Sequence, residues 1–112
     1  GVADRVSFLG YVDDDRLPGL YAGATVHVTL SAFEAYGMTV AEALAAGTPA
    51  LVRQARALAD WCEFEGCTCV EDTDPSTVAA GVETAVSATP RETPPTWDGV
   101  CESVLAVYEQ SL

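Results

Sequence analysis

Two glutamates, and the glycine between them, are the residues in this chain best suited to bind a polar ligand. Glu34 and Glu42 stand eight residues apart, and Gly37 lies where an expected strand and loop give way to an expected helix. Gly37 permits a positive φ angle or a close approach of the backbone to a ligand. The amides of residues 38–40 would then lie at a helix N-terminus, which favours anions even without cationic side chains.

The spacing of the two carboxylates restricts the chemistry. With Glu34 before the helix and Glu42 one turn into it, a rise of 1.5 Å per residue separates them by about 10 Å. A glycosidase acid and nucleophile need a separation of about 5 Å. The wider spacing suits an elongated ligand with hydroxyl groups at both ends and a diphosphate between them, because ionised carboxylates accept strong hydrogen bonds.

The elements that must position these residues alternate along the chain. Strands are expected at residues 6–9, 25–30, 50–52 and 67–70. Helices are expected at 17–23, capped by Asp13–Asp15, at 39–46, closed by Gly47, and at 97–110. A further helix is expected to follow the turn at 72–75, with Val78, Val82 and Val86 on one face. Residues 53–65 are expected to be irregular with a helical turn at 57–61, and 89–95 to be a connector. This order predicts an α/β fold whose parallel, Rossmann-like sheet has helices on both faces. Ligands of such sheets bind beyond the carboxyl ends of the strands, which points to the segment after Leu30.

That segment, with its neighbours, resembles a known family. Residues 31–49 resemble the E-x7-E motif of retaining GT-B glycosyltransferases of the group 1, or family 4, type, in their C-terminal nucleotide-sugar-binding domain. The blocks VSFLGYV, LPGLYAGATVHV, EALAAGTPALV, a D-P-x-x-V helix and T-W-D extend the resemblance over most of the chain. It implies that residues 1–112 are a partial donor-binding domain, the truncated second half of a GT-B C-terminal domain.

The resemblance also assigns roles to residues. Glu34 would contact hydroxyls of the donor sugar, and Glu42 would bind the ribose hydroxyls of the nucleotide. The sugar and diphosphate would meet the amides of Gly37, Met38 and Thr39, and the loop would be lined by Ser31 and Phe33. Such enzymes transfer a sugar from a nucleotide-diphosphate donor with retention, need no metal or other cofactor, and use the leaving phosphate to help deprotonate the acceptor.

The chain departs from the family pattern at several points. It has Ala35 where the family often has glycine. Relatives often carry a glycine-rich loop that contains a further glutamate, and this chain has residues 54–62 (QARALADWC) in its place. The chain is expected to begin at the third strand of the domain, so the family's basic pair for the diphosphate and its N-terminal acceptor-binding domain would lie outside these residues. In a sheet ordered 3-2-1-4-5-6, residues 6–9 lack their native neighbour; the chain is then an excerpt, or residues 6–9 pair with 26–30, or two copies associate through the open edge. A stand-alone nucleotide- or protein-binding module without catalysis is the alternative function.

Charge limits the partners and the setting. The chain has 17 acidic residues, five arginines and no lysine, for a net charge of −12. A nucleic acid or an anionic membrane surface would be repelled. The balance is typical of a high-salt cytoplasm, where salt screens self-repulsion; a dedicated acidic interaction face is the alternative. No signal peptide or transmembrane segment is visible, so a cytoplasmic location is expected.

The remaining residues each carry two interpretations. The cysteine spacing fits no zinc pattern, so reduced, buried thiols are expected. His27 is either a pocket residue or a hydrogen-bonded histidine of the sheet. Arg53 and Arg56 follow a strand end, where they would either approach phosphate or form surface ion pairs. Trp97 and Tyr108 are expected to anchor the core.

Overall fold

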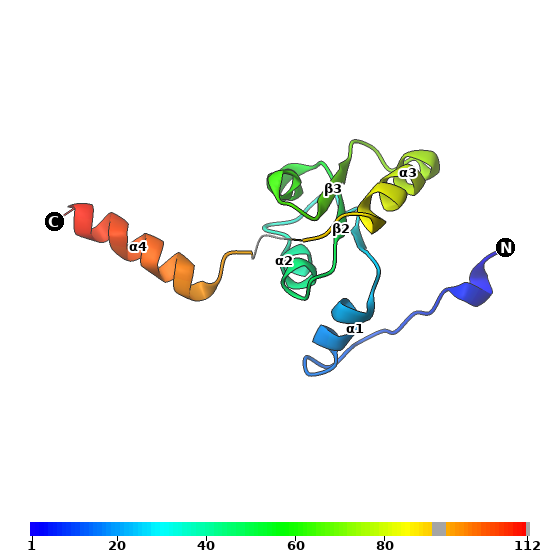
Figure 1. Cartoon of the computed structure of the whole chain (residues 1–112), viewed down its shortest axis with the longest axis horizontal. Coiled ribbons are helices and arrows are strands. Elements are labelled where there is room, and N and C mark those ends of the chain that lie inside the picture. Colours follow the sequence, from blue (N-terminus) through cyan, green and yellow to red (C-terminus); the bar gives the residue numbers. More distant parts are fainter. Residues whose placement is uncertain (91–93, 112) are drawn as a thin grey trace.

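The computed structural model describes residues 1–90 and 94–111 and has one parallel sheet. Its strands β1 (His27–Thr29), β2 (Ala50–Arg53) and β3 (Cys67–Val70) lie in the order β1-β2-β3 (Figure 1). In register, Val28 lies opposite Leu51, which in turn lies opposite Thr68. The expected parallel α/β fold is therefore confirmed, and β2 and β3 lie within a residue of where the sequence predicts them.

Helices cover both faces of this sheet. The helical elements are η1 (Ala3–Arg5), α1 (Leu17–Gly23), α2 (Met38–Ala45), η2 (Arg56–Glu63), α3 (Pro75–Val86) and α4 (Trp97–Ser111), where η marks a 3-10 helix. On one face the core consists of Val40, Leu44, Ala50, Val52, Leu58 and Trp61, from α2, β2 and η2. On the other face Leu51 and Val70 pack against Ala85 of α3. Successive residues of β2 thus serve opposite cores, as the alternation of side chains along a strand requires.

The strand expected at residues 6–9 does not form. These residues have no regular secondary structure, and Phe8 is 96% exposed. The sheet ends at β1 in this chain, so no neighbouring strand supplies the hydrogen bonds that a strand at 6–9 would need. Neither the proposed pairing with residues 26–30 nor a strand at this position is present.

β1 is shorter than expected, whereas α1 has the expected bounds but lacks the expected aspartate cap. The predicted strand at 25–30 is reduced to His27–Thr29, and Val28 is 40% exposed, because β1 is an edge strand of the sheet rather than a buried one. The first helix begins at Leu17, where Arg16 is the N-cap and no side chain caps it. Asp13 contributes its backbone carbonyl instead, which accepts hydrogen bonds from the Arg16 and Leu17 amides at 3.0 and 3.1 Å.

α3 meets the sheet through small residues rather than through its valine stripe alone. Gly81 and Ala85 are buried, whereas Val86 is exposed. A Cβ at Gly81 would lie 2.7 Å from Val70 Cγ1 and 2.9 Å from Leu51 Cδ1, so only glycine admits this close helix–sheet contact. Val78 and Val82 pack around this contact as expected.

The last helix does not join the core. α4 has the expected bounds within a residue, but none of its residues is buried; Trp97 is 79% and Tyr108 68% exposed. The prediction that both anchor the core is wrong, since α4 extends away from the sheet (Figure 1). Residues 91–93 of the expected connector lie outside the described residues, and 89–90 and 94–96 have no helix.

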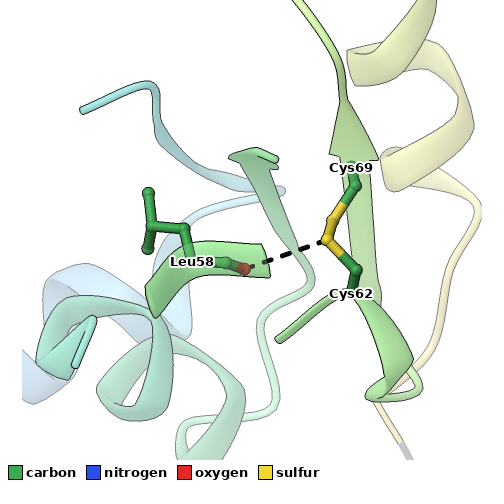
Figure 2. The surroundings of a disulfide bond; sticks show 3 residues. All are labelled: Leu58, Cys62 and Cys69. Carbon is green, nitrogen blue, oxygen red and sulfur yellow. Dashed lines mark hydrogen bonds between the residues drawn. A yellow bond between two sulfur atoms is a disulfide. The ribbon is translucent and has the colours of Figure 1, made fainter. Parts of the chain in front are cut away.

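A disulfide links η2 to β3. Cys62 ends up 5.7 Å from Cys69, measured between Cα atoms, and the two sulfurs are bonded (Figure 2). This separation lies within the range that a disulfide spans. The expectation of reduced thiols is therefore wrong for this pair, because η2 extends over residues 56–63, beyond the single turn predicted, and brings Cys62 back to the sheet. Cys67 and Cys101 are free thiols.

Among the described helices, none is both long and apolar enough to cross a membrane.

Candidate functional site

Gly37 makes the turn that opens α2. Its φ and ψ of 89° and 49° are left-handed, and it is the N-cap of the helix. Its carbonyl accepts hydrogen bonds from the Val40 and Ala41 amides, at 3.0 and 3.2 Å. The predicted positive φ is thus confirmed, whereas the Val40 amide is already used within the helix. Amides at the start of a helix have no intrahelical acceptor and are available to a ligand.

η2 supports this turn from behind. A Cβ at Gly37 would lie 3.0 Å from both Leu58 Cδ2 and Trp61 Nε1. Trp61 Nε1 donates a 2.7 Å hydrogen bond to the carbonyl of Tyr36, and the rings of Trp61 and Tyr36 meet edge to face. The sequence pattern predicts an irregular segment at residues 53–65 and does not predict this contact. The one available signal is a tryptophan within a polar stretch, because the indole N–H of a buried tryptophan usually has a hydrogen-bond partner.

The loop before Gly37 holds Ser31, Phe33 and Glu34. Ser31 Oγ donates to the carbonyl of Phe33 at 3.0 Å and accepts its amide at 3.3 Å, which closes a local turn. The Phe33 ring is exposed, and the guanidinium carbon of Arg56 lies 4.5 Å from its centroid. Arg56 has a positive φ of 49°. The loops after β1 and β2 are therefore in contact at the carboxyl end of the sheet, with half-buried Glu34 beside them.

Glu42 lies in the second turn of α2 and faces α1. Its Oε2 accepts a 2.9 Å hydrogen bond from the hydroxyl of Tyr21. Both residues line a pocket of about 570 Å³, whose other walls are Asp14, Leu17, Pro18, Ala45 and Ala46. The sequence placed Tyr21 on the apolar face of its helix and missed the hydrogen bond.

His27 lies behind this pair. Its ring meets the Tyr21 ring edge to face, with 5.5 Å between centroids. Burial lowers the pKa of His27, and the charge of Glu42 partly opposes that shift. Its Nε2 is buried and has no hydrogen-bond partner among the described residues. His27 is thus neither an open pocket residue nor a fully hydrogen-bonded histidine of the sheet.

The predicted site residues therefore divide into two groups. The first group belongs to the loop before α2 and to the N-cap and first turn of that helix: Ser31, Phe33, Glu34, Gly37, Met38 and Thr39. Glu42 lies on the flank of the same helix, toward α1. Among the described residues, no three His, Cys, Asp or Glu side chains are grouped so that they could hold a metal ion.

Curated proteins similar to this chain are glycosyltransferases and a sugar-phosphate synthase. The mannosylfructose-phosphate synthase of Agrobacterium fabrum is 48% identical over 52 residues, 46% of this chain and 12% of that protein. An uncharacterised glycosyltransferase of Methanocaldococcus jannaschii is 38% identical over 88 residues, which are 78% of this chain and 23% of that protein. A GDP-mannose-dependent alpha-(1-6)-phosphatidylinositol dimannoside mannosyltransferase of Mycobacterium tuberculosis is 34% identical over 83 residues, 73% of this chain and 22% of its own.

The chain spans less than a quarter of the length of each of these relatives. No solved structure matches it significantly. The family comparison is broader, because residues 1–94 match the sequence model described as Glycosyl transferases group 1. With its parallel α/β sheet and a match over most of its length, the chain belongs to the group 1 glycosyltransferases.

Proposed function

We propose that this chain binds the nucleotide-diphosphate-sugar donor of a retaining glycosyltransferase. The observation that carries the proposal is the Gly37 turn, which opens α2 between two carboxylates, with Glu34 in the loop before it and Glu42 one turn into the helix. The diphosphate would accept hydrogen bonds from the amides of Gly37, Met38 and Thr39. Glu34 would hold hydroxyls of the donor sugar, and Glu42 those of the ribose.

The chemistry expected of this arrangement is electrostatic. As the bond between the sugar and the diphosphate breaks, negative charge grows on the leaving phosphate oxygen, and amide donors fixed by the Gly37 turn stabilise it. The acceptor hydroxyl adds to the sugar carbon on the face that the phosphate leaves, and its proton passes to the leaving phosphate. Glu34 contributes by holding the sugar in the orientation that this transfer needs.

The setting of the reaction is part of the proposal. An acceptor-binding domain of the same polypeptide would close over the donor, and the protein would work in a high-salt cytoplasm, in keeping with its net charge of −12. A second copy paired at the open edge of β1 remains an alternative partner. Since one relative is named as GDP-mannose-dependent, GDP-mannose is the first donor to test.

The test is Glu42→Gln in the full natural protein that carries these residues. We expect the KM for the donor to rise about tenfold or more, because hydrogen bonds to a charged group are worth about 1.5–3 kcal/mol. Glu34→Gln should mainly lower kcat, since Glu34 would hold the sugar that is transferred. Glu83→Gln, an exposed change on α3, is the control and should alter neither.

Two outcomes would contradict the proposal. An unchanged donor KM in Glu42→Gln would remove the ribose role. Donor binding without any transfer to an acceptor in the unaltered protein would instead indicate a binding module.

A further inference from the structure

We infer that Tyr21 is a positioning residue, whose hydroxyl fixes the Glu42 carboxylate in the orientation that receives the nucleoside end of the donor. The inference rests on the proposed function of Glu42. It begins from the 2.9 Å hydrogen bond between the Tyr21 hydroxyl and Glu42 Oε2, which joins α1 to α2 across 21 residues of sequence. No described residue donates a hydrogen bond to Oε1 of Glu42.

A carboxylate on a helix flank otherwise samples several rotamers, and a ligand must then order it on binding. A carboxylate already held by one donor loses less freedom when the ligand arrives, so the ligand binds more tightly. Each carboxylate oxygen accepts two hydrogen bonds, so the bond from Tyr21 leaves capacity for ribose hydroxyls at both oxygens.

Tyr21 is itself held in place from two sides. Thr48, which is buried, donates its hydroxyl to the carbonyl of Tyr21, and the Ala24 amide donates to the same carbonyl at 3.0 Å. The ring rests edge to face on His27 of β1. These contacts of the Tyr21 backbone and ring restrict the side chain, so its hydroxyl is held next to Glu42.

The Tyr21 hydroxyl is a hydrogen-bond donor at neutral pH. Burial, together with the hydrogen bond and charge of Glu42, raises the pKa of Tyr21 to about 12. The phenol is therefore protonated at neutral pH, and the hydrogen bond to the carboxylate persists.

The pocket that Tyr21 and Glu42 share fits a nucleoside better than a diphosphate. Most of its walls are apolar, from Leu17, Pro18 and two alanines, which suits the face of a base. Asp14 and Glu42 give it two carboxylates and no cationic side chain, which repel phosphate. An uncharged base and ribose therefore fit here, with the diphosphate directed away toward the start of α2.

The test is Tyr21→Phe in the full natural protein, with GDP-mannose and its 2′-deoxy and 3′-deoxy ribose analogues as donors. The ring and its contact with His27 remain, and only the hydroxyl is lost. We expect the donor KM to rise roughly fivefold to tenfold with kcat nearly unchanged, because the donor must then order a carboxylate that Tyr21 held in place before. The preference for the ribose donor over the deoxy donors should shrink.

Two further variants separate positioning from structure. Tyr11→Phe, on a tyrosine that is 88% exposed, is the matched control and should leave KM and the ribose preference unchanged. In the double variant with Glu42→Gln, Tyr21→Phe should add little to the loss from Glu42→Gln alone, because the two residues act as one unit.

The outcomes distinguish this inference from the function on which it rests. If Glu42→Gln raises the donor KM but Tyr21→Phe leaves KM and ribose preference intact, positioning by Tyr21 is wrong and the role of Glu42 stands. A fall in kcat with an intact ribose preference would also overturn it, since that pattern marks a structural role. If Glu42→Gln itself leaves KM unchanged, the proposed function fails first.

Discussion

Two features of the structure require glycine at position 37, its backbone conformation and the lack of space for a side chain, and substitutions can distinguish them. Its positive φ of 89° excludes side chains on conformational grounds, and a Cβ there would also press on Leu58 and Trp61 at 3.0 Å. Gly47 has a similar φ of 82°, but a Cβ there meets nothing within 4 Å. We therefore expect Gly47→Ala to lower the free energy of unfolding by about 1–2 kcal/mol, the ordinary cost of a left-handed residue.

Gly37→Ala should lower that free energy by about 1–3 kcal/mol more than Gly47→Ala, because overpacking adds to the conformational cost. Urea denaturation followed by tryptophan fluorescence measures both. Equal losses in the two variants would mean that η2 moves aside freely, and that it does not brace the turn.

The sequence predicts a residue's role where the backbone conformation alone determines it, but it does not predict a role that depends on a contact with a distant residue. The positive φ at Gly37 follows from its place between a strand and a helix. Tyr21 gives no such signal, because a tyrosine on an apolar helix face looks like a core residue until the crossing of α1 and α2 brings Glu42 to its hydroxyl. The positive φ of Arg56 was equally hidden, since the left-handed region is unusual for a non-glycine residue.

The disulfide covalently joins η2, the helix that packs against the Gly37 turn, to β3. Cys62 and Cys69 close a loop with a sequence separation of 7 (Figure 2). Leu58 and Trp61 are the buried residues of η2. Cys62 Sγ also lies 3.8 Å from the carbonyl of Leu58, within reach of a hydrogen bond that only the reduced thiol can donate. We expect reduction to lower the free energy of unfolding by about 2–3 kcal/mol, the chain-entropy value for so short a loop.

Thermal unfolding with and without dithiothreitol measures this loss, and Cys62→Ser/Cys69→Ser should reproduce it without reductant. Cys101→Ser, at an exposed free thiol, is the control. A melting temperature that does not respond to dithiothreitol would show that η2 is held by its side-chain packing alone.

Whole elements were predictable where local pattern and tertiary partner coincide. β2, β3 and α2 have both a strong pattern and packing partners from other elements, and their bounds agree closely with expectation. Residues 6–9 have the pattern of a strand but no adjacent strand, so they remain extended and exposed. α4 is helical as its periodicity predicts, yet periodicity cannot specify what its apolar side contacts.

At the scale of the whole molecule, the chain is more extended than its length suggests. Its radius of gyration is 16.1 Å and its extents are 63 × 32 × 25 Å, whereas a compact domain of this size has a radius of about 13 Å. The excess comes from the N-terminal segment and α4, which project in opposite directions (Figure 1). The fully buried side chains belong to the sheet and the helices against it, so the stability of the fold is concentrated there.

That small core must hold together a net charge of −12. Self-repulsion among the acidic residues opposes compaction in dilute buffer, and molar salt shortens the screening length from about 30 Å at 0.01 M to about 3 Å at 1 M. We therefore expect the melting temperature to rise from dilute buffer to molar potassium chloride. Each kcal/mol of repulsion relieved should raise it by about 4–8 °C in a domain of this size.

The control replaces Asp13, Asp14 and Asp15 by asparagine, which changes the net charge from −12 to −9. Their side chains are exposed and cap no helix, so the native fold should persist while the dependence on salt weakens. Sucrose at matched osmolality tests whether the gain comes from screening, because an uncharged osmolyte stabilises by exclusion from the surface and should act equally on both proteins. A melting temperature that stays flat or falls in potassium chloride would contradict adaptation to high salt and leave the acidic surface to a binding role.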